Sequence, residues 1–331
     1  MGRKYKTAGV DIEKLRKVKK EIKKYIKQTF FKKPLCPGLF ASGIEIKGFK
    51  NPVIVATTDG VGTKLLVAKR MGVYDTIGKD LVNHSINDII SIGADPLFFQ
   101  DYISFSDIEE WIIKDIIKGI RDACKKEKVV LGGGETAQLP GIYKKGDFEL
   151  AGTMIGIVEK ERIIDGTKIR KGDAVIGLLS NGLHTNGYSL ARKILFKEKK
   201  LKPITYIPEL KCTLGEELLK VHRSYRKEIK AVLSQLNGIA HITGGGFYEN
   251  IKRVLPSHLD CVIEVKWEIP FIFKLIQEYG KVDRKEMFEV FNMGIGMVLF
   301  VSQDKKEKVL KKIKGVEIGY VKTGKHRVII Q

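Results

Sequence analysis

The stretch Val53–Lys64 constrains the fold most, because it joins a strand-forming run to a glycine-rich segment that carries charge. Its first residues, Val53–Val55, are β-branched or branched aliphatic, which is the composition of a buried strand. It continues as Thr57-Thr58-Asp59-Gly60-Val61-Gly62-Thr63-Lys64. Glycine lets the backbone turn and approach a ligand closely. The carboxylate, hydroxyls and ammonium beside the glycines are the groups that hold a metal-bound polyphosphate, although an ordinary solvated turn has the same composition.

The chain has 331 residues, more than one hydrophobic core usually supports, so we expect two domains. The turn-rich segment Asp165–Asp173 marks the boundary, and the predicted domains are 1–168 and 169–331. No run of about 18 apolar residues occurs, so no membrane span is predicted. The cysteines lie far apart, with no C-x-x-C pair, which predicts neither a zinc site nor a disulfide framework and suits a cytoplasmic protein.

Basic residues outnumber acidic ones by 60 to 39, which gives a formal net charge of +21. A basic protein can bind nucleic acid or another polyanion. Here most lysines occur at the polar positions of predicted amphipathic helices, and the sequence contains no zinc finger and no basic motif interleaved with aromatic residues. We therefore interpret them as solvated helix faces and expect no nucleic-acid partner, while a basic nucleic-acid-binding protein stays as an unfavoured alternative.

The apolar spacing predicts mixed helices and strands in both halves. The expected helices are 11–33, 76–92, 107–126 (opened by a Ser106/Glu109 capping box), 188–199, 213–236, 247–255 and 304–313. One expected strand starts at Val53. The other expected strands are 96–104, 129–131, 149–158, 174–179, 260–265, 294–301, 316–321 and 327–330. Segment 34–46 is a loop with glycine and proline, interpreted as a flap or as a chain crossing a neighbouring surface.

The predicted helix 76–92 carries one polar stripe on an otherwise apolar sequence. Asp80, Asn83 or His84, Asn87 and Ser91 recur at helical spacing. Such a stripe is either a solvent-facing surface or the lining of a site. Asp88 follows Asn87 directly, which makes this pair a second candidate for metal or phosphate chemistry.

Four strand ends are rich in glycine and carry polar groups: TTDGVGTK, GGGET, SNGLHTNG and HITGGG. No P-loop, Rossmann, H-E-x-x-H or G-x-S-x-G motif is present. Asp59, Asp88 and Glu135 suit Mg²⁺, which prefers carboxylates and substrate phosphates. Helix starts after the last two segments offer free N–H donors for a phosphate. The residues alone therefore indicate an Mg²⁺–nucleotide enzyme with a second phosphorylated ligand.

The same stretches resemble the phosphoribosylformylglycinamidine cyclo-ligase (PurM) family, in family order over nearly the whole chain. The matching segments are 5–12 (YKTAGVDI), 57–64 (TTDGVGTK), 77–82 (IGKDLV), 87–88 (ND), 93–102 (GADPLFFQDY), 132–143 (GGGETAQLPGIY), 180–195 (SNGLHTNGYSLARKIL), 239–256 (IAHITGGGFYENIKRVLP) and 291–297 (FNMGIGM). Two places depart from the pattern: the glycine-poor loop PLCPGLFASGIEI and the lead-in His84-Ser85-Ile86.

The resemblance implies ATP-dependent closure of formylglycinamidine ribonucleotide to aminoimidazole ribonucleotide, with release of ADP and phosphate, in purine biosynthesis. It implies a two-domain α/β (α+β) PurM-like fold, with an N-terminal ATP-binding and dimerisation domain whose sheet pairs into a barrel across a homodimer, and a C-terminal α/β domain. Another enzyme of the superfamily, a small-molecule kinase or dikinase, is the alternative.

The resemblance also assigns roles to residues. ATP and Mg²⁺ are the implied cofactors, with Asp59, Asp88 and Glu135 as metal ligands. His184 would be the general acid or base, and Lys64 and Asp59 would act on the phosphoryl group; His241 is a rival to His184 that we interpret as structural. The nucleotide-binding residues would be Gly60, Gly62, Thr63, Lys64, Asn87, Gly133, Gly134 and Thr136. The substrate residues would be Asn181, His184, Asn186, Thr243, Gly244, Gly245 and Gly246.

Overall fold

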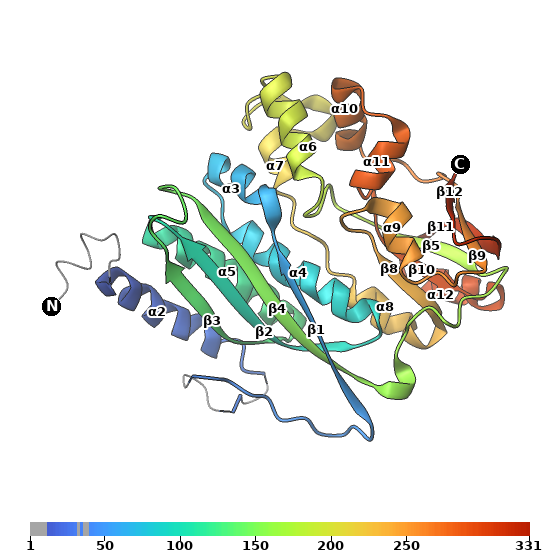
Figure 1. The fold of residues 1–331 in the computed structure, drawn as a ribbon, viewed down its shortest axis with the longest axis horizontal. Helices are drawn as coiled ribbons and strands as arrows, with labels where there is room; N and C mark the ends of the chain where they lie inside the picture. Colours follow the sequence, from blue (N-terminus) through green and yellow to red (C-terminus); the bar gives the residue numbers. More distant parts are fainter. Residues whose placement is uncertain (1–11, 32–33, 36–39) are drawn as a thin grey trace. The chain divides into compact units, whose positions relative to one another are not determined.

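The computed structural model describes residues 12–31, 34–35 and 40–331. The chain forms two compact units, one of Met1–Ile89 with Asp95–Lys160 and one of Ile90–Ala94 with Glu161–Gln331. Each unit is described by itself (Figure 1). The first residue of the predicted helix 11–33 and its end at 32–33, the N-terminal segment 5–11 of the resemblance and residues 36–39 of the loop lie outside the described residues.

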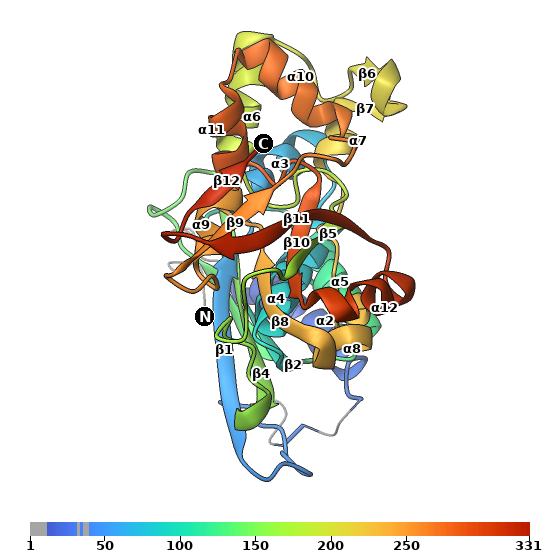
Figure 2. The same ribbon diagram turned by 90° about the vertical axis from the view of Figure 1, so that its right-hand side faces the viewer.

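Unit 1 is a four-stranded sheet with helices on one face. Its elements are α2 (Ile12–Lys27), β1 (Pro52–Gly60), η1 (Gly62–Lys64), α3 (Leu65–Met71), α4 (Asp75–Ser91), β2 (Asp95–Phe105), α5 (Glu110–Glu127), β3 (Val130–Gln138) and β4 (Phe148–Glu159). The strand order is β1-β4-β2-β3, antiparallel except for the parallel pair β2–β3. Figure 2 shows α2, α4 and α5 on the same side of these strands.

Alternation along β1 sorts its side chains between the two faces of the sheet. Ile54 and Thr58 are exposed, whereas Thr57 and Asp59 are partly buried on the face that α4 covers. Helix α4 also packs closely on α5, because a side chain at Gly78 or Gly119 would overlap the backbone of the other helix. The polar groups that α4 carries are therefore held against the inner face of the sheet.

Unit 2 is a six-stranded sheet in the order β12-β9-β11-β5-β10-β8. Its strands and helices are β5 (Ala174–Leu179), α6 (Tyr188–Arg192), the π-helix η3 (Lys193–Glu198), α7 (Leu214–Leu218), α8 (Arg226–Val232), β8 (Leu236–His241), α9 (Gly246–Lys252), β9 (Leu259–Ile263), α10 (Phe271–Gly280), α11 (Arg284–Val290), β10 (Ile295–Val301), α12 (Lys306–Lys312), β11 (Gly315–Thr323) and β12 (Val328–Ile330). Every residue of β10, which lies between β5 and the edge strand β8, is buried, so the core of this unit extends along it.

Most predicted elements are confirmed, and the differences have physical causes. Thr57–Gly60 is the end of strand β1 rather than a turn, because it pairs with β4 through Gly60. The glycines of GGGET likewise lie inside β3, paired with β2. The Ser106/Glu109 capping box is wrong: α5 starts at Glu110 and has no side-chain cap. The capping box of this chain joins Thr213 and Glu216 at α7.

The predicted helix 213–236 is wrong as a single helix. It breaks into α7 and α8, a 3₁₀ turn (Leu233–Gln235) follows, and Leu236 already belongs to β8. Helices α10 and α11 were not predicted.

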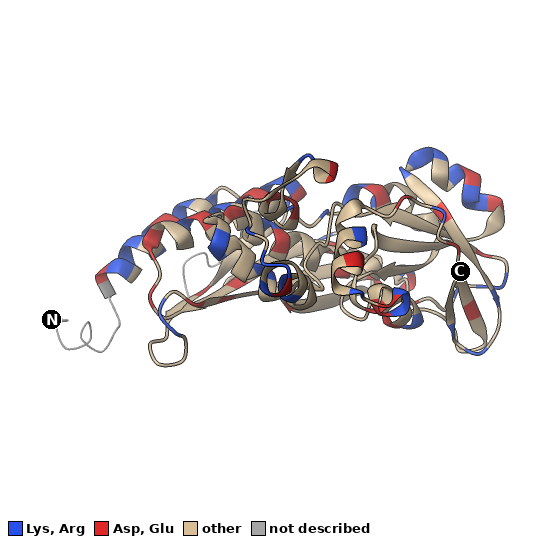
Figure 3. Cartoon of the chain, turned by 90° about the horizontal axis from the view of Figure 1, so that it is seen from above, with Lys and Arg blue, Asp and Glu red and all other residues tan. Residues whose placement is uncertain are grey.

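Charge is spread along the helices of both units. Figure 3 shows Lys and Arg interspersed with Asp and Glu on the helices, as expected for solvated faces. In the described part of the chain, no helix has the length and apolar content needed to cross a bilayer.

Candidate functional site

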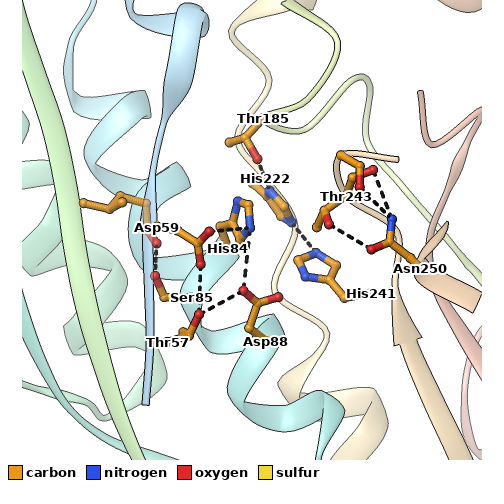
Figure 4. A network of polar contacts seen from close by, with 12 residues as sticks. Thr57, Asp59, His84, Ser85, Asp88, Thr185, His222, His241, Thr243 and Asn250 are labelled. Carbon is orange, nitrogen blue, oxygen red and sulfur yellow. Dashed lines mark hydrogen bonds and ion pairs between the residues drawn. The ribbon is translucent and has the colours of Figure 1, made fainter. Parts of the chain in front are cut away.

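A histidine and two carboxylates converge at the inner face of unit 1. His84 Nε2 lies 3.8 Å from Asp59 Oδ1 and 3.8 Å from Asp88 Oδ2. The hydroxyl of Thr57 donates to Asp59 Oδ2 at 3.0 Å and contacts Asp88 Oδ2 at 3.3 Å (Figure 4). Strand β1 supplies Thr57 and Asp59 at i and i+2, and α4 supplies His84 and Asp88 at i and i+4, so two regular elements fix the group.

The polar stripe of α4 does not face solvent. Asp80 and Asn87 are fully buried, and Asn83 and His84 are 7% exposed. Burying this many polar side chains costs free energy unless they are hydrogen-bonded or paired within the protein or line a binding site. The solvent-facing interpretation of the stripe is therefore wrong, and the site-lining interpretation remains.

Lys64 does not face a phosphate site in this structure. Its ammonium lies 2.7 Å from Asp80 Oδ2, and both side chains have no exposed surface. Burial lowers the pKa of Lys64, while the Asp80 carboxylate opposes that shift. The sequence-based prediction that Lys64 neutralises phosphoryl charge did not take Asp80 into account, whose carboxylate pairs with the Lys64 ammonium. The pair ties η1 to α4, directly after Gly60, Gly62 and Thr63.

Glu135 is not brought together with Asp59 and Asp88 within the chain. Asp59, Gly152, Asp101 and Gly134 form one row across β1, β4, β2 and β3, on the inner face. Glu135 comes next to Gly134 and therefore points to the other face. Three strand spacings of about 4.8 Å also separate its strand from β1. The three carboxylates that were predicted to hold one or two Mg²⁺ ions therefore lie in two places within one chain, Asp59 with Asp88 and Glu135 apart from them, because strand order follows from long-range pairing.

A pocket of about 980 Å³ lies beside β3 and α2 in unit 1. Gly133, Gly134 and Thr136, three of the predicted nucleotide-binding residues, line it. Its other lining residues are Lys19, Ile22, Lys23, Ile26, Lys27, Phe30, Pro34, Phe40, Ala41, Ser42, Gln100, Asp101, Gly132 and Glu135. Ser42 donates to the carbonyl of Gly132 at 2.5 Å, so the described end of loop 34–46 is fastened to β3. Cationic, apolar and backbone groups thus meet in one cavity.

Asp101 is the buried acid of this pocket. It is 6% exposed, and burial raises its pKa to about 7, with the nearby Glu135 carboxylate adding to the rise. Gly134 leaves room for it, since a side chain there would overlap the Asp101 backbone and carboxylate. A carboxyl with a pKa near neutrality in a pocket is a candidate for proton chemistry or for hydrogen-bond donation.

His184, one of the predicted substrate residues of unit 2, lies in the loop after β5. This residue is 1% exposed and has a φ of 61°, in the left-handed region. Its Nε2 lies 3.2 Å from Asn181 Oδ1, and Asn181 donates to the carbonyl of Val221 at 2.6 Å. A side chain at Gly296 would overlap both the His184 ring and the Tyr225 hydroxyl. The loop after β5 therefore holds this imidazole in a strained but well-packed place.

His222 joins His184 and His241 into one cluster of imidazoles. The rings of His184 and His222 stack with centroids 3.9 Å apart. His222 Nε2 lies 3.1 Å from His241 Nε2, and its Nδ1 lies 3.2 Å from Thr185 Oγ1 (Figure 4). Sequence reasoning missed His222, because the apolar spacing around it predicted a continuous helix.

The glycine segment after β8 is held by Asn250 of α9. The amide of Asn250 donates to the carbonyls of Thr243, Gly244 and Gly246 at 3.3, 3.1 and 2.8 Å. Gly245 and Gly246 have φ values of 87° and 56°, which glycine adopts without strain. Gly244 is exposed and faces the Asn186 side chain. The structure thus brings Asn186, Thr243 and the three glycines together, as predicted.

Comparison with known proteins identifies the family. Residues 46–158 match the N-terminal domain of AIR synthase related protein, and residues 170–331 match its C-terminal domain. The phosphoribosylformylglycinamidine cyclo-ligase of Thermoanaerobacter pseudethanolicus is 47% identical over 321 residues, covering 96% of both chains. That of Pseudothermotoga lettingae is 45% identical over 339 residues and covers all of both chains.

Solved structures share the fold at low identity. Thiamine-monophosphate kinase from Stenotrophomonas maltophilia has a TM-score of 0.70 at 15% identity, covering 93% of this chain and 94% of its own. Hydrogenase maturation protein HypE in complex with ATP has a TM-score of 0.67 at 14% identity, covering 92% and 88%. With full-length relatives well above 30% identity, the chain belongs to the phosphoribosylformylglycinamidine cyclo-ligase family.

Proposed function

We propose that this ligase closes formylglycinamidine ribonucleotide to aminoimidazole ribonucleotide with ATP, releasing ADP and phosphate, in purine biosynthesis. The match to cyclo-ligases along the whole chain carries this proposal. The chemical problem is that an amide oxygen leaves poorly. ATP phosphorylates the formyl oxygen, the amidine-derived nitrogen attacks the same carbon, and phosphate departs as the ring closes. Catalysis of the first step is mostly positioning and charge neutralisation.

The residues of unit 1 fit a divalent cation. Asp59, Asp88 and the Thr57 hydroxyl offer hard oxygen donors, which Mg²⁺ prefers together with phosphate oxygens. When bound, the ion would neutralise charge on the ATP phosphates. Asn87, which is buried and precedes Asp88 on α4, would support the metal shell. Glu135 would act separately, at the pocket next to Lys19.

The pocket beside β3 suits the nucleotide. Lys19, Lys23 and Lys27 recur every four residues along α2 and line it, so they would supply cationic groups for an anionic part of the nucleotide in addition to Lys64. Phe30 and Phe40 offer apolar surface for a base. Gly60, Gly62 and Thr63 lead into the buried Lys64–Asp80 pair and would contact the nucleotide through backbone groups.

Unit 2 would bind the ribonucleotide substrate. We assign His184 as the general acid or base of ring closure, because an imidazole titrates near neutral pH and Asn181 orients its Nε2. Asn186, Thr243 and Gly244–Gly246 would hold the ribose phosphate through hydroxyl, amide and backbone N–H groups. The hydrogen bonds of Asn250 keep that segment in place.

The outer face of the unit 1 sheet supports a homodimer. Ile54 and Tyr102 are 54% and 38% exposed on the side of the sheet away from the helices. An open sheet face with apolar side chains favours burial against a second copy. Light scattering should therefore give twice the mass of 37.3 kDa. We place the enzyme in the cytoplasm, where Cys124, Cys212 and Cys261 would stay as the free thiols that they are here.

An assay with formylglycinamidine ribonucleotide, ATP and Mg²⁺ tests the function. Aminoimidazole ribonucleotide should form in one-to-one ratio with ADP. ADP release without ring closure would contradict the cyclo-ligase and favour a small-molecule kinase of the same fold. Asp59→Asn should abolish both products and weaken binding of Mg²⁺–ATP, while Asp107→Asn, at an exposed carboxylate of unit 1, should leave both unchanged.

A further inference from the structure

His84 is an imidazole beside two carboxylates that the reaction above does not use. It lies one turn before Asp88 on α4, and its side chain is 9% exposed. Figure 4 shows its ring directed toward Asp59 of β1 and Asp88, and a single atom, Nε2, faces both. The imidazole nitrogen therefore faces one carboxylate oxygen on each of two packed elements.

We propose that His84 is a third protein ligand of the cation held by Asp59 and Asp88, so that the site accepts a divalent transition metal such as Mn²⁺, Co²⁺ or Zn²⁺ besides Mg²⁺. This inference rests on the proposed function, which assigns Asp59 and Asp88 to a cation. It adds the identity of a ligand and the class of metal.

The distances favour a ligand over an ion pair. A charged imidazole bonded to a carboxylate has a nitrogen–oxygen separation of about 2.7–2.9 Å. The separations of His84 Nε2 from Asp59 and Asp88 are both 3.8 Å, too long for a hydrogen bond. Two metal–ligand bonds of about 2.1 Å span up to about 4.2 Å, so one cation reaches the nitrogen and either oxygen.

The chemistry of the donors favours a transition metal. Carboxylate and hydroxyl oxygens suit Mg²⁺, whereas imidazole suits the later first-row divalent metals. With His84 included, the set contains one imidazole nitrogen besides the carboxylate oxygens, and that nitrogen shifts the preference of the site toward these metals. Thr57 touches both carboxylates and restricts their rotation, so the donors are already turned toward one another.

The backbone that carries His84 is also fixed. Helix α4 is anchored on α5 through Gly78 and Gly119, and the hydroxyl of Ser85 donates to the carbonyl of Leu81 at 2.8 Å. A ligand on such a rigid, buried helix needs little ordering when the metal binds.

Pulsed EPR of Mn²⁺ bound to the full chain tests the proposal. The wild-type protein should show the ¹⁴N modulation of a directly bound imidazole. His84→Ala and His84→Gln should reduce or lose that modulation and bind Mn²⁺ at least about tenfold more weakly. Competition with Mg²⁺ should show a change in Mg²⁺ affinity of less than about threefold in His84→Gln, whose amide oxygen is a donor that Mg²⁺ accepts.

The matched control is His258→Ala, at an exposed histidine of unit 2, which should behave as wild type. Thermal unfolding followed by circular dichroism checks that each variant folds, and His84→Gln keeps a polar group of similar reach if the alanine variant does not fold. Mn²⁺ that binds the wild type without ¹⁴N modulation would overturn the proposal. So would modulation of full amplitude in a folded His84 variant.

The carboxylates separate this test from the proposed function. If Asp59→Asn and Asp88→Asn lose Mn²⁺ and Mg²⁺ while the wild type lacks nitrogen coupling, only the role of His84 is wrong. If both variants bind the two metals as the wild type does, the cation site of the proposed function is wrong, and the inference about His84 falls with it.

Discussion

The two units handle buried polarity in different ways. In unit 1 the buried polar groups near the candidate site include charged ones: Lys64 with Asp80, and Asp101 in the pocket. In unit 2 the groups at the loop ends are amides, hydroxyls and imidazoles joined by hydrogen bonds, as around His184 and Asn250. Charged side chains are suited to binding a cation and a polyphosphate. Amides, hydroxyls and imidazoles are suited to transferring protons and to binding a neutral or singly charged group.

The backbone differs in the same sense. The charged residues of unit 1 lie on strands and helices, such as Asp59 on β1 and Asp88 on α4. The polar residues of unit 2 lie on loops with left-handed residues, such as His184 and Gly245. Regular elements hold groups that repel or attract strongly, and loops bring donors close to a ligand. The units therefore divide the proposed reaction into phosphate activation and ring closure.

The largest expected effect comes from breaking the buried ion pair of unit 1. Lys64→Met leaves Asp80 charged and fully buried, and removing one partner of such a pair costs about 3–5 kcal/mol in the free energy of unfolding. Urea denaturation measures it. Lys64→Met combined with Asp80→Leu should recover most of the loss, because no unpaired charge remains buried.

The matched control for this pair is Lys69→Met. Lys69 and Asp147 lie 2.9 Å apart but are 40% and 41% exposed, so the loss should stay within about 1 kcal/mol. If Lys64→Met proved as stable as wild type yet weakened ATP binding, Lys64 would contact phosphate after all, and the contrast between a structural and a catalytic charge would disappear.

The second effect tests whether the units divide the substrates. Asp88→Asn should lower kcat for ring closure by about 10²–10³-fold, about 3–4 kcal/mol, because phosphoryl charge loses its counter-ion. It should raise KM for ATP and leave KM for formylglycinamidine ribonucleotide unchanged. Asn181→Ala, in unit 2, should do the reverse. Equal changes in both KM values in both variants would contradict the division.

In unit 1 the sequence predicted the site residues that lie on one strand and one helix better than it predicted contacts between distant elements. Asp59 and Asp88 were predicted together, because a strand end and a helix stripe have fixed periods. The separation of Glu135 from Asp59 was not predicted, since nothing local in GGGET reveals that β3 lies at the opposite edge from β1. The pairing of Lys64 with Asp80 was not predicted for a related reason: Asp80 is 16 positions away, and only packing shows that both are buried.

In unit 2 the apolar periodicity of the sequence did not predict where the loops lie. His222 lies where an apolar pattern runs on while the chain leaves the helix between α7 and α8. The partners of its ring, Thr185 and His241, come from two other segments. The glycine run did indicate the tight turn after β8, because Gly245 and Gly246 have positive φ, a local demand that glycine meets without strain. Local demands can be predicted, whereas contacts between distant loops cannot.

The third effect concerns pH and the acid of the pocket. An unfolded aspartate has a pKa near about 3.9, whereas burial raises that of Asp101 to about 7. Between these values the folded chain keeps a proton that the unfolded chain releases, so stability falls as pH rises, by about 1.4 kcal/mol per unit. From pH 5 to pH 7 the wild type should lose about 2 kcal/mol more than Asp101→Asn, measured by urea denaturation. Parallel curves for the two proteins would mean that Asp101 is already ionised at pH 5.

The smallest expected effect concerns the cluster of imidazoles in unit 2, formed by His184, His222 and His241. His222→Phe keeps a ring to stack on His184 but removes both nitrogens that contact Thr185 and His241. We expect kcat for ring closure to fall about tenfold, about 1.4 kcal/mol, because His241 loses its partner and the polar support of the cluster weakens. KM for ATP and binding of Mg²⁺ should not change, since the variant alters no residue that we assign to the nucleotide or to the cation.

His258→Phe, at an exposed position, is the control for the loss of a histidine. A second variant, Thr185→Val, removes only the hydroxyl that contacts His222 Nδ1 and should lower kcat by less than His222→Phe does. If His222→Phe kept full activity, the cluster would only pack the loop, and His184 would act without it. If it instead weakened binding of Mg²⁺–ATP, unit 2 would take part in phosphate activation, and the contrast between a charged and a neutral unit would not describe the enzyme.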